Sequence, residues 1–139
     1  MDSHDAHKLT TRGEAHLYAA IAKADGIVSR QEILKAPGLA RAGRKVLDIL
    51  GVNKTAGEDV AAEVRSVLED PALASWSARE HLDEAIGLLK EAAKHGAWFT
   101  ELVVHKHEEG LRQTALLDGY VMKESTMLKE IKRRLSELT

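Results

Sequence analysis

The sequence predicts an all-α fold, a single-domain bundle of about six to seven helices. Apolar residues recur at spacings of three and four along most of the chain, which is the period of one helical face. No stretch alternates apolar and polar residues as a half-buried strand does. Several segments begin with serine or threonine three residues before glutamate, the spacing of a helix capping box.

Length and composition predict one soluble, cytoplasmic domain. The chain has 139 residues, of which 44% are hydrophobic, so it can form one core and is too short to expect two. We expect a flexible N-terminal tail at residues 1–8 and one helical domain at residues 9–139. Charges of both signs are interspersed and sum to −2, which argues against nucleic acid as a partner. Without cysteines or a run of ~20 apolar residues, we expect neither disulfides nor direct membrane insertion.

The first helix is expected to start at Thr10 or Thr11. It should end at Gly26, because glycine readily adopts the backbone conformation that terminates helices. Its predicted apolar face consists of Leu17, Tyr18, Ile21 and Ala24.

The second helix is expected to begin at Ser29, with Glu32 as the reciprocal partner of the cap. A break or kink is expected near Ala36, because Pro37 lacks an amide hydrogen and restricts the residue before it. The helical pattern then resumes, with an apolar face made of Leu39, Ala42, Val46, Ile49 and Leu50.

Three more helices are expected at residues 55–70, 77–96 and 100–119, followed by a last one from residue 121. The apolar faces of the first two comprise Val60, Ala61, Val64, Val67 and Leu68, then Ala78, Leu82, Ala85, Ile86, Leu89 and Ala93. Those of the last two include Leu102, Val103, His107, Leu111, Thr114 and Leu117, then Met127, Leu128, Ile131 and Leu135. Aromatic residues near helix starts, which usually close the end of a bundle, are Trp76, Trp98 and Phe99.

Two Asp-Gly turns break a local rule. Asp25 and Asp118 each stand in the last turn of a predicted helix, where the helix dipole disfavours an acid by roughly 0.3 to 1 kcal/mol. Such violations are more frequent at functional or strained positions, because something nearby has to offset them. Aligning the two turns suggests an internal pseudo-repeat of two helix-turn-helix units, which pairs Gly26 with Gly119, Val28 with Val121, Glu32 with Glu124, and Glu14 with His107.

The candidate metal site lies between these two turns. If the first and fifth predicted helices pack antiparallel, Asp25 comes near His107 and Glu14 comes near Asp118. Oxygen ligands from both turns can then hold a hard divalent cation, whose identity the sequence does not give. The candidate ligands are Asp25, Glu32, Asp118, Glu124, His107 and Glu14.

Folding alone offers a second interpretation of the same residues. Asp25 and Asp118 can be turn acids that bond nearby amides, Glu32 half of a cap, and His107 a satisfied, semi-buried histidine. A third interpretation is ion pairing that positions a partner-binding surface. A calcium-binding EF-hand is disfavoured, because an isoleucine and a lysine occupy its first and third loop positions.

The residues around the first turn resemble a known family. The stretch Ala22-Lys23-Ala24-Asp25-Gly26-Ile27-Val28-Ser29, followed by Glu32, resembles the signature of the TerB-like tellurite-resistance family. The same signature is also seen in the N-terminal region of some membrane-anchored DnaJ-like co-chaperones. The family's second Asp-Gly helix pair is similar to Leu117-Asp118-Gly119 and Glu124. The resemblance departs from the family at Pro37-Gly38, and at Met122, where a second capping serine is expected.

The resemblance implies an all-helical bundle of two such units and a non-enzymatic role in tellurite resistance or stress response. It also implies an acidic metal site and a membrane partner such as a TerC-like protein, which would hold the chain at the inner face of the membrane. The residues themselves also argue against an enzyme, because the sequence has no Gly-rich phosphate loop, no His-Glu-x-x-His motif and no Gly-x-Ser-x-Gly elbow. The alternative function is a metal-free helical adaptor or scaffold that binds a protein partner.

Overall fold

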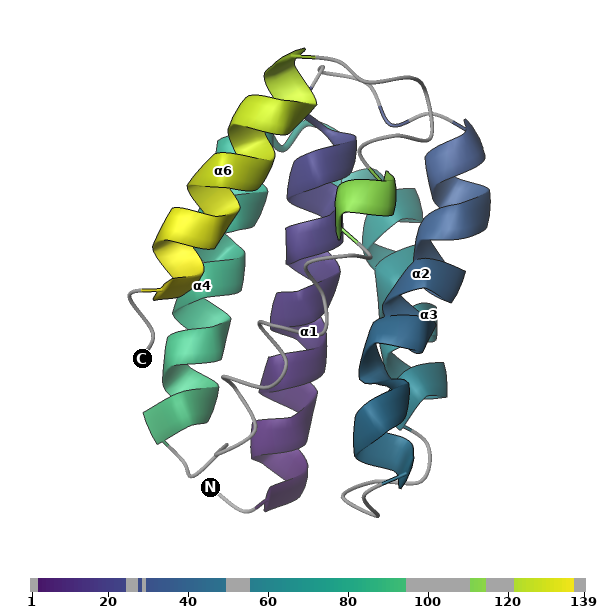
Figure 1. Ribbon diagram of the computed structural model, residues 1–139, viewed down its shortest axis with the longest axis vertical. Coiled ribbons are helices and arrows are strands. Elements are labelled where there is room, and N and C mark those ends of the chain that lie inside the picture. The colour runs from purple at the N-terminus through teal and green to yellow at the C-terminus, as the bar shows by residue number, and fades with distance from the viewer. Residues whose placement is uncertain are drawn as a thin grey trace.

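All regular structure in the described part of the chain is helical, which confirms the predicted all-α bundle. The computed structural model describes residues 3–24, 28, 30–49, 56–94, 111–114 and 122–136. Its helices are α1 (Ser3–Ala22), α2 (Arg30–Ile49), α3 (Ala56–Glu69), the short 3-10 helix η1 (Pro71–Leu73), α4 (Ala78–Lys94) and α6 (Met122–Ser136). Residues 111–114 are helical as well. Figure 1 shows the helices gathered around α1 in one bundle.

The central helix of this bundle is α1. In Figure 1 it lies between α4 and α6 on one side and α2 and α3 on the other, and it contacts all four. Every residue from Gly13 to Ala22 is buried, so the predicted apolar face around Leu17 and Ile21 is confirmed but is only part of the buried surface. A helix that is covered on all sides needs small residues where its neighbours come close, and this stretch contains Gly13, Ala15, Ala19, Ala20 and Ala22.

Gly13 sets how closely α1 approaches α4. A Cβ atom at this position would lie 2.9 Å from Cγ of Leu89 and 3.3 Å from the carbonyl oxygen of Ala85. The first distance is shorter than side chains tolerate, so the Leu89 side chain or one of the two helices would have to move. Packing, rather than a turn, is therefore the reason for glycine at this position.

The start of α1 differs from the prediction. The helix begins at Ser3, about two turns before Thr10 and Thr11, where the sequence pattern placed its start. Residues 3–12 contain neither proline nor glycine, so no residue in this stretch interrupts a helix. Thr10 and Thr11 are themselves buried, with 0% and 6% of their surface exposed, and thus belong to the packed helix rather than to its cap.

Of the break or kink predicted near Ala36, the break does not occur. The helix runs without interruption from Arg30 to Ile49 with Pro37 inside it. Proline removes one backbone hydrogen bond, here the one to the carbonyl of Ile33, but its fixed φ is compatible with a helix. Ala36, Pro37 and Ala40 are buried, and the burial of their apolar surface contributes against this loss. Ala42, which was predicted on the apolar face, is exposed.

The segment from α3 to α4 follows the sequence prediction closely. The buried face of α3 comprises Val60, Ala61, Val64 and Val67. Asp70 ends the helix and caps η1, accepting a hydrogen bond from the amide of Ala72 at 2.9 Å. Ser77 and Glu80 form the predicted capping box of α4: the Glu80 amide donates to Oγ of Ser77, and the Ser77 amide donates to Oε1 of Glu80, each at 3.1 Å.

The inner face of α4 is also close to the predicted one. It comprises His81, Leu82, Ala85, Ile86, Leu89 and Ala92, so His81 joins the face and Ala92 takes the place predicted for Ala93, which is exposed. On α6, Leu128 and Ile131 are buried as predicted, and Arg134 binds Asp83 of α4 at 3.0 Å. Leu111 and Thr114 are buried on their predicted stripe. None of the helices described is both long and apolar enough to cross a bilayer.

We predict that Gly13→Ala lowers the free energy of unfolding by about 1 to 3 kcal/mol, because it forces an extra carbon into a packed interface. Helix propensity would act in the opposite direction by ~1 kcal/mol. Gly87 on α4 is the matched control, since nothing lies within 4 Å of a Cβ built there. Gly87→Ala should instead stabilise the protein by about 0.5 to 1 kcal/mol. Urea denaturation followed by circular dichroism compares the two, and a Gly13→Ala protein as stable as the native one would contradict the close packing.

Candidate functional site

Two of the six predicted metal ligands are buried in the bundle. Glu14 on α1 has 0% of its surface exposed, and Glu32 on α2 has 1%. A buried carboxylate is strongly disfavoured unless it is paired, hydrogen-bonded or bound to a metal ion. Both residues take part in interactions within the chain. Glu32 thus faces the core and is more than the exposed half of a helix cap.

The other predicted ligands cannot be placed in the same way. Asp25, His107 and Asp118 lie outside the described residues, and Glu124 belongs to α6 with only its backbone described. Within the described part of the chain, no group of three or more histidine, aspartate or glutamate side chains is arranged to hold a metal ion. The metal site between the two Asp-Gly turns therefore stays a prediction.

A second buried polar cluster was not predicted from the sequence. His16 of α1 and His81 of α4 face each other with their Nδ1 atoms 2.9 Å apart, and they are 1% and 2% exposed. The ring of Trp76, just before α4, stacks on His16 with centroids 5.6 Å apart and lies 5.2 Å from that of His81. Because a hydrogen bond needs one donor and one acceptor, one Nδ1 carries a hydrogen and the other does not. The accepting imidazole is therefore neutral in this arrangement.

The surroundings of the two histidines favour the neutral state. Burial lowers the pKa of His16 to about 4, and the positive charges of His81 and Arg12 act in the same direction. Burial likewise lowers the pKa of His81 to about 4, assisted by Lys23 and Arg12 and opposed by Glu80. At neutral pH the pair is therefore uncharged and holds α1 to α4.

The sequence carries one signal for this pair. His81 stands four residues before Ala85 on the apolar stripe of its helix, which places it on the core side. The partner of His81 was not predictable in the same way, because His16 lies 65 residues away in the chain.

A small cavity of about 270 Å³ lies beside His81. Two polar side chains contribute to its wall, Lys23 and His81, and both are engaged in bonds within the protein. The Lys23 ammonium donates to the carbonyl oxygen of Ala74 at 2.7 Å, and His81 is bonded to His16. The other lining residues are Ala19, Val28, Ile33, Val67, Leu68, Leu73 and Ala74. This cavity is mostly apolar, and its polar groups serve to join η1 and α4 to α1.

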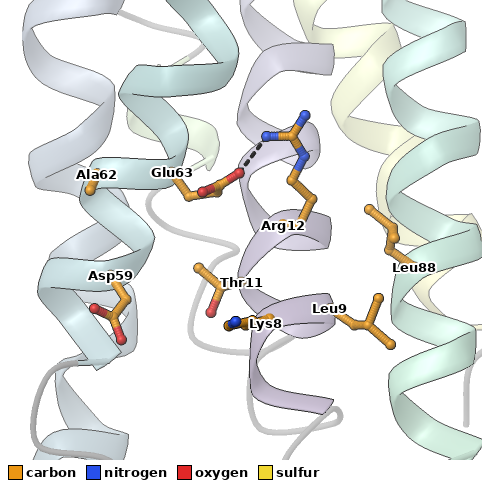
Figure 2. Close-up of a pocket in the computed structure, with 8 residues that line it drawn as sticks. All are labelled: Lys8, Leu9, Thr11, Arg12, Asp59, Ala62, Glu63 and Leu88. Atoms are coloured by element: carbon orange, nitrogen blue, oxygen red, sulfur yellow. Dashed lines mark hydrogen bonds and ion pairs between the residues drawn. The ribbon is translucent and has the colours of Figure 1, made fainter. Parts of the chain in front are cut away.

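A larger depression lies where the N-terminal half of α1 reaches the surface between α3 and α4. We call it the α1 groove; it has a volume of about 630 Å³ and is lined by Lys8, Leu9, Thr11, Arg12, Asp59, Ala62, Glu63 and Leu88. Figure 2 shows that the acidic side chains come from α3 and the basic ones from α1, while Leu9 and Leu88 point toward each other between α1 and α4. An ion pair between Arg12 and Glu63 joins α1 to α3 across the groove.

We predict that the protein loses stability as the pH falls from about 6.5 toward 4, because the unfolded chain binds protons on His16 and His81 that the folded pair resists. Stability from this source is complete above pH 6.5. The expected loss is on the order of 3 kcal/mol for an imidazole that stays neutral down to about pH 4. Urea titrations at several pH values measure it.

A His81→Gln variant tests the origin of this pH dependence. It removes one of the two titrating imidazoles, so its free energy of unfolding should change less between pH 7 and pH 5, above most carboxylate titration, than that of the native protein. If the free energy of unfolding of the variant changes with pH as steeply as that of the native protein, the histidine pair is not the source of the pH dependence. Because the test compares how the free energy of unfolding changes with pH, it stays valid even if the variant is less stable at every pH.

Comparison with known proteins identifies no family or function for this chain. No family model, curated protein or solved structure matches this chain. The resemblance to the TerB-like family therefore stays a prediction that rests on the residues of the two Asp-Gly turns.

Proposed function

We propose that this chain is a non-enzymatic, TerB-like protein of tellurite resistance or stress response that holds a divalent cation with acidic side chains. The observation that supports the proposal most is the burial of two predicted ligands, Glu14 and Glu32, on two helices that contact each other. Carboxylates are rarely found in a protein core unless a positive charge or strong hydrogen bonds accompany them. A divalent cation supplies that charge.

The chemistry of the proposed ligand set suits a hard cation. Calcium and magnesium are bound by carboxylate and carbonyl oxygens, and five of the six candidate residues are acids. The remaining candidate, His107, would favour manganese or zinc. In the proposed role the chain acts in the cytoplasm, at the inner face of the membrane through a partner such as a TerC-like protein.

We predict that the chelator-stripped protein binds at least one of calcium, magnesium, manganese and zinc in calorimetric titrations. Glu14→Gln and Glu32→Gln should each weaken binding by about tenfold or more, because each removes a charged oxygen ligand and keeps the shape of the side chain. Asp25→Asn and Asp118→Asn extend the test to the two turns. Glu69→Gln, at an exposed position of α3, is the matched control and should leave binding unchanged.

Two results would contradict the metal proposal. Native protein that binds none of the four ions would show that protein groups alone hold the buried acids. Binding that survives all four substitutions would place the cation elsewhere. Circular dichroism of each variant establishes that a loss of binding is not a loss of folding.

The α1 groove favours a second candidate function, that of a metal-free helical adaptor. It combines apolar side chains with charged ones on a surface formed by three helices, which is the composition of many peptide-binding sites. The two functions predict different responses to chelation, since an adaptor would bind its partner equally well without metal. Partner binding that requires a divalent cation would argue for the first function and against the second.

A further inference from the structure

We propose that the cavity beside His81 binds the anion of a small carboxylic acid with an apolar body. This cavity, which we call the η1 cavity, lies where the C-terminal ends of α1 and α3 meet η1 and the first turn of α4. The inference is independent of both proposed functions. The described residues that line the η1 cavity include neither Glu14 nor Glu32, and none of them lines the α1 groove.

Most of the wall of the η1 cavity is apolar and belongs to the packed bundle. Val67 and Leu73 are part of the core, and Ile33 and Leu68 are half-buried beside them. The cavity has a volume of about 270 Å³. Since a dry cavity of about 150 Å³ is enough for benzene, the η1 cavity has room for an apolar group of roughly six to ten carbon atoms.

The Lys23 ammonium adds a positive charge to this wall. It donates one hydrogen bond, to the carbonyl oxygen of Ala74 at 2.7 Å, and has no other hydrogen bond or ion pair within the described part of the chain. An ammonium has three N–H groups, so two of them are available to a ligand. Among the described residues of the lining there is no aspartate or glutamate that would compete for them.

The His81 ring offers a second polar group. Its Nδ1 atom is turned to Nδ1 of His16 at 2.9 Å, so Nε2 is the nitrogen left for a ligand, and it has no hydrogen bond within the described part of the chain. When His16 is the donor of the bond between the two Nδ1 atoms, neutral His81 carries its hydrogen on Nε2 and can donate it.

The charges around His81 are predominantly positive. Burial lowers the pKa of His81 to about 4, and Lys23 is the charge that acts most strongly in the same direction. Arg12 adds to this effect, and Glu80 opposes it. Such an environment favours an anion beside the ring over a second cation.

These features together select an apolar anion as the occupant. A wholly apolar molecule would remove the free N–H groups of Lys23 from water without bonding them, which is costly. A cationic molecule would be repelled by the same ammonium. A carboxylate has two accepting oxygens and forms a charge-assisted hydrogen bond with the ammonium, while its hydrocarbon body occupies the apolar part of the cavity.

The test uses three probes that share one hydrocarbon chain and differ in charge: octanoate, octanamide and octylammonium. Calorimetric titration into the full chain at neutral pH measures their affinities. We expect octanoate to bind about tenfold or more tightly than octanamide, because only octanoate forms a charged bond with Lys23. Octylammonium should bind more weakly than octanamide.

Substitutions locate the binding site. Lys23→Met removes the ammonium and keeps an apolar stem, so it should weaken octanoate by about tenfold and leave octanamide unchanged. Lys90→Met is the matched control, because Lys90 is exposed on α4 and does not line the η1 cavity. Leu68→Trp adds bulk at a half-buried position of the wall and should weaken octanoate and octanamide alike.

Three results would overturn the proposal. The first is that neither octanoate nor octanamide binds, and the second is that the two bind equally well. The third is octanoate binding that folded Lys23→Met and Leu68→Trp proteins retain in full, which would place the ligand elsewhere. Circular dichroism establishes that each variant is folded. If Leu68→Trp does not fold, the comparison of Lys23→Met with Lys90→Met decides the question alone.

Discussion

The burial of the C-terminal half of α1, from Gly13 to Ala22, is the constraint on which the rest of the structure depends. The helices on either side of the bundle meet through α1, and it contacts α2, α3, α4 and α6. Such a central helix requires short distances to its neighbours, which Gly13 and the alanines of α1 provide. The interface with α4 leaves no room for one additional carbon at Gly13. The positions of the outer helices are thus fixed by the surface of the inner one.

The same constraint gathers the polar chemistry of the protein along one helix. From Gly13 to Ala22 every residue of α1 is buried, so the polar side chains of this stretch have to be satisfied inside the bundle. His16 is satisfied by His81, and Glu14 belongs to the predicted acidic site. The α1 groove begins where the helix is no longer covered. One element therefore positions the imidazole pair, one buried acid and the groove.

The sequence predicted the features whose causes are local. The capping box of Ser77 and Glu80 depends on residues three apart, and the fold class depends on helical periodicity, so both were readable from the chain. A break or kink near Ala36 was predicted from the same kind of local rule, and the break does not occur, at a position where Ala36, Pro37 and Ala40 are buried in the bundle. The pairing of His16 with His81 was not predictable, since it depends on which helices become neighbours. For the metal site, two of the candidate ligands, Glu14 and Glu32, are buried, and the alternative interpretation of Glu32 as half of a cap understates how deeply that side chain lies.

The central position of α1 also has a consequence for how the chain is made. This helix is synthesised before every helix that covers it, and the residues of α4 and α6 that contact it follow only from residue 78 and residue 122 onward. The leucine, tyrosine and isoleucine side chains of α1 become fully buried only after these later segments have been synthesised. A nascent chain of this protein therefore exposes the apolar surface of its future core until most of its length has left the ribosome, which is the condition in which partly folded chains are most prone to aggregate.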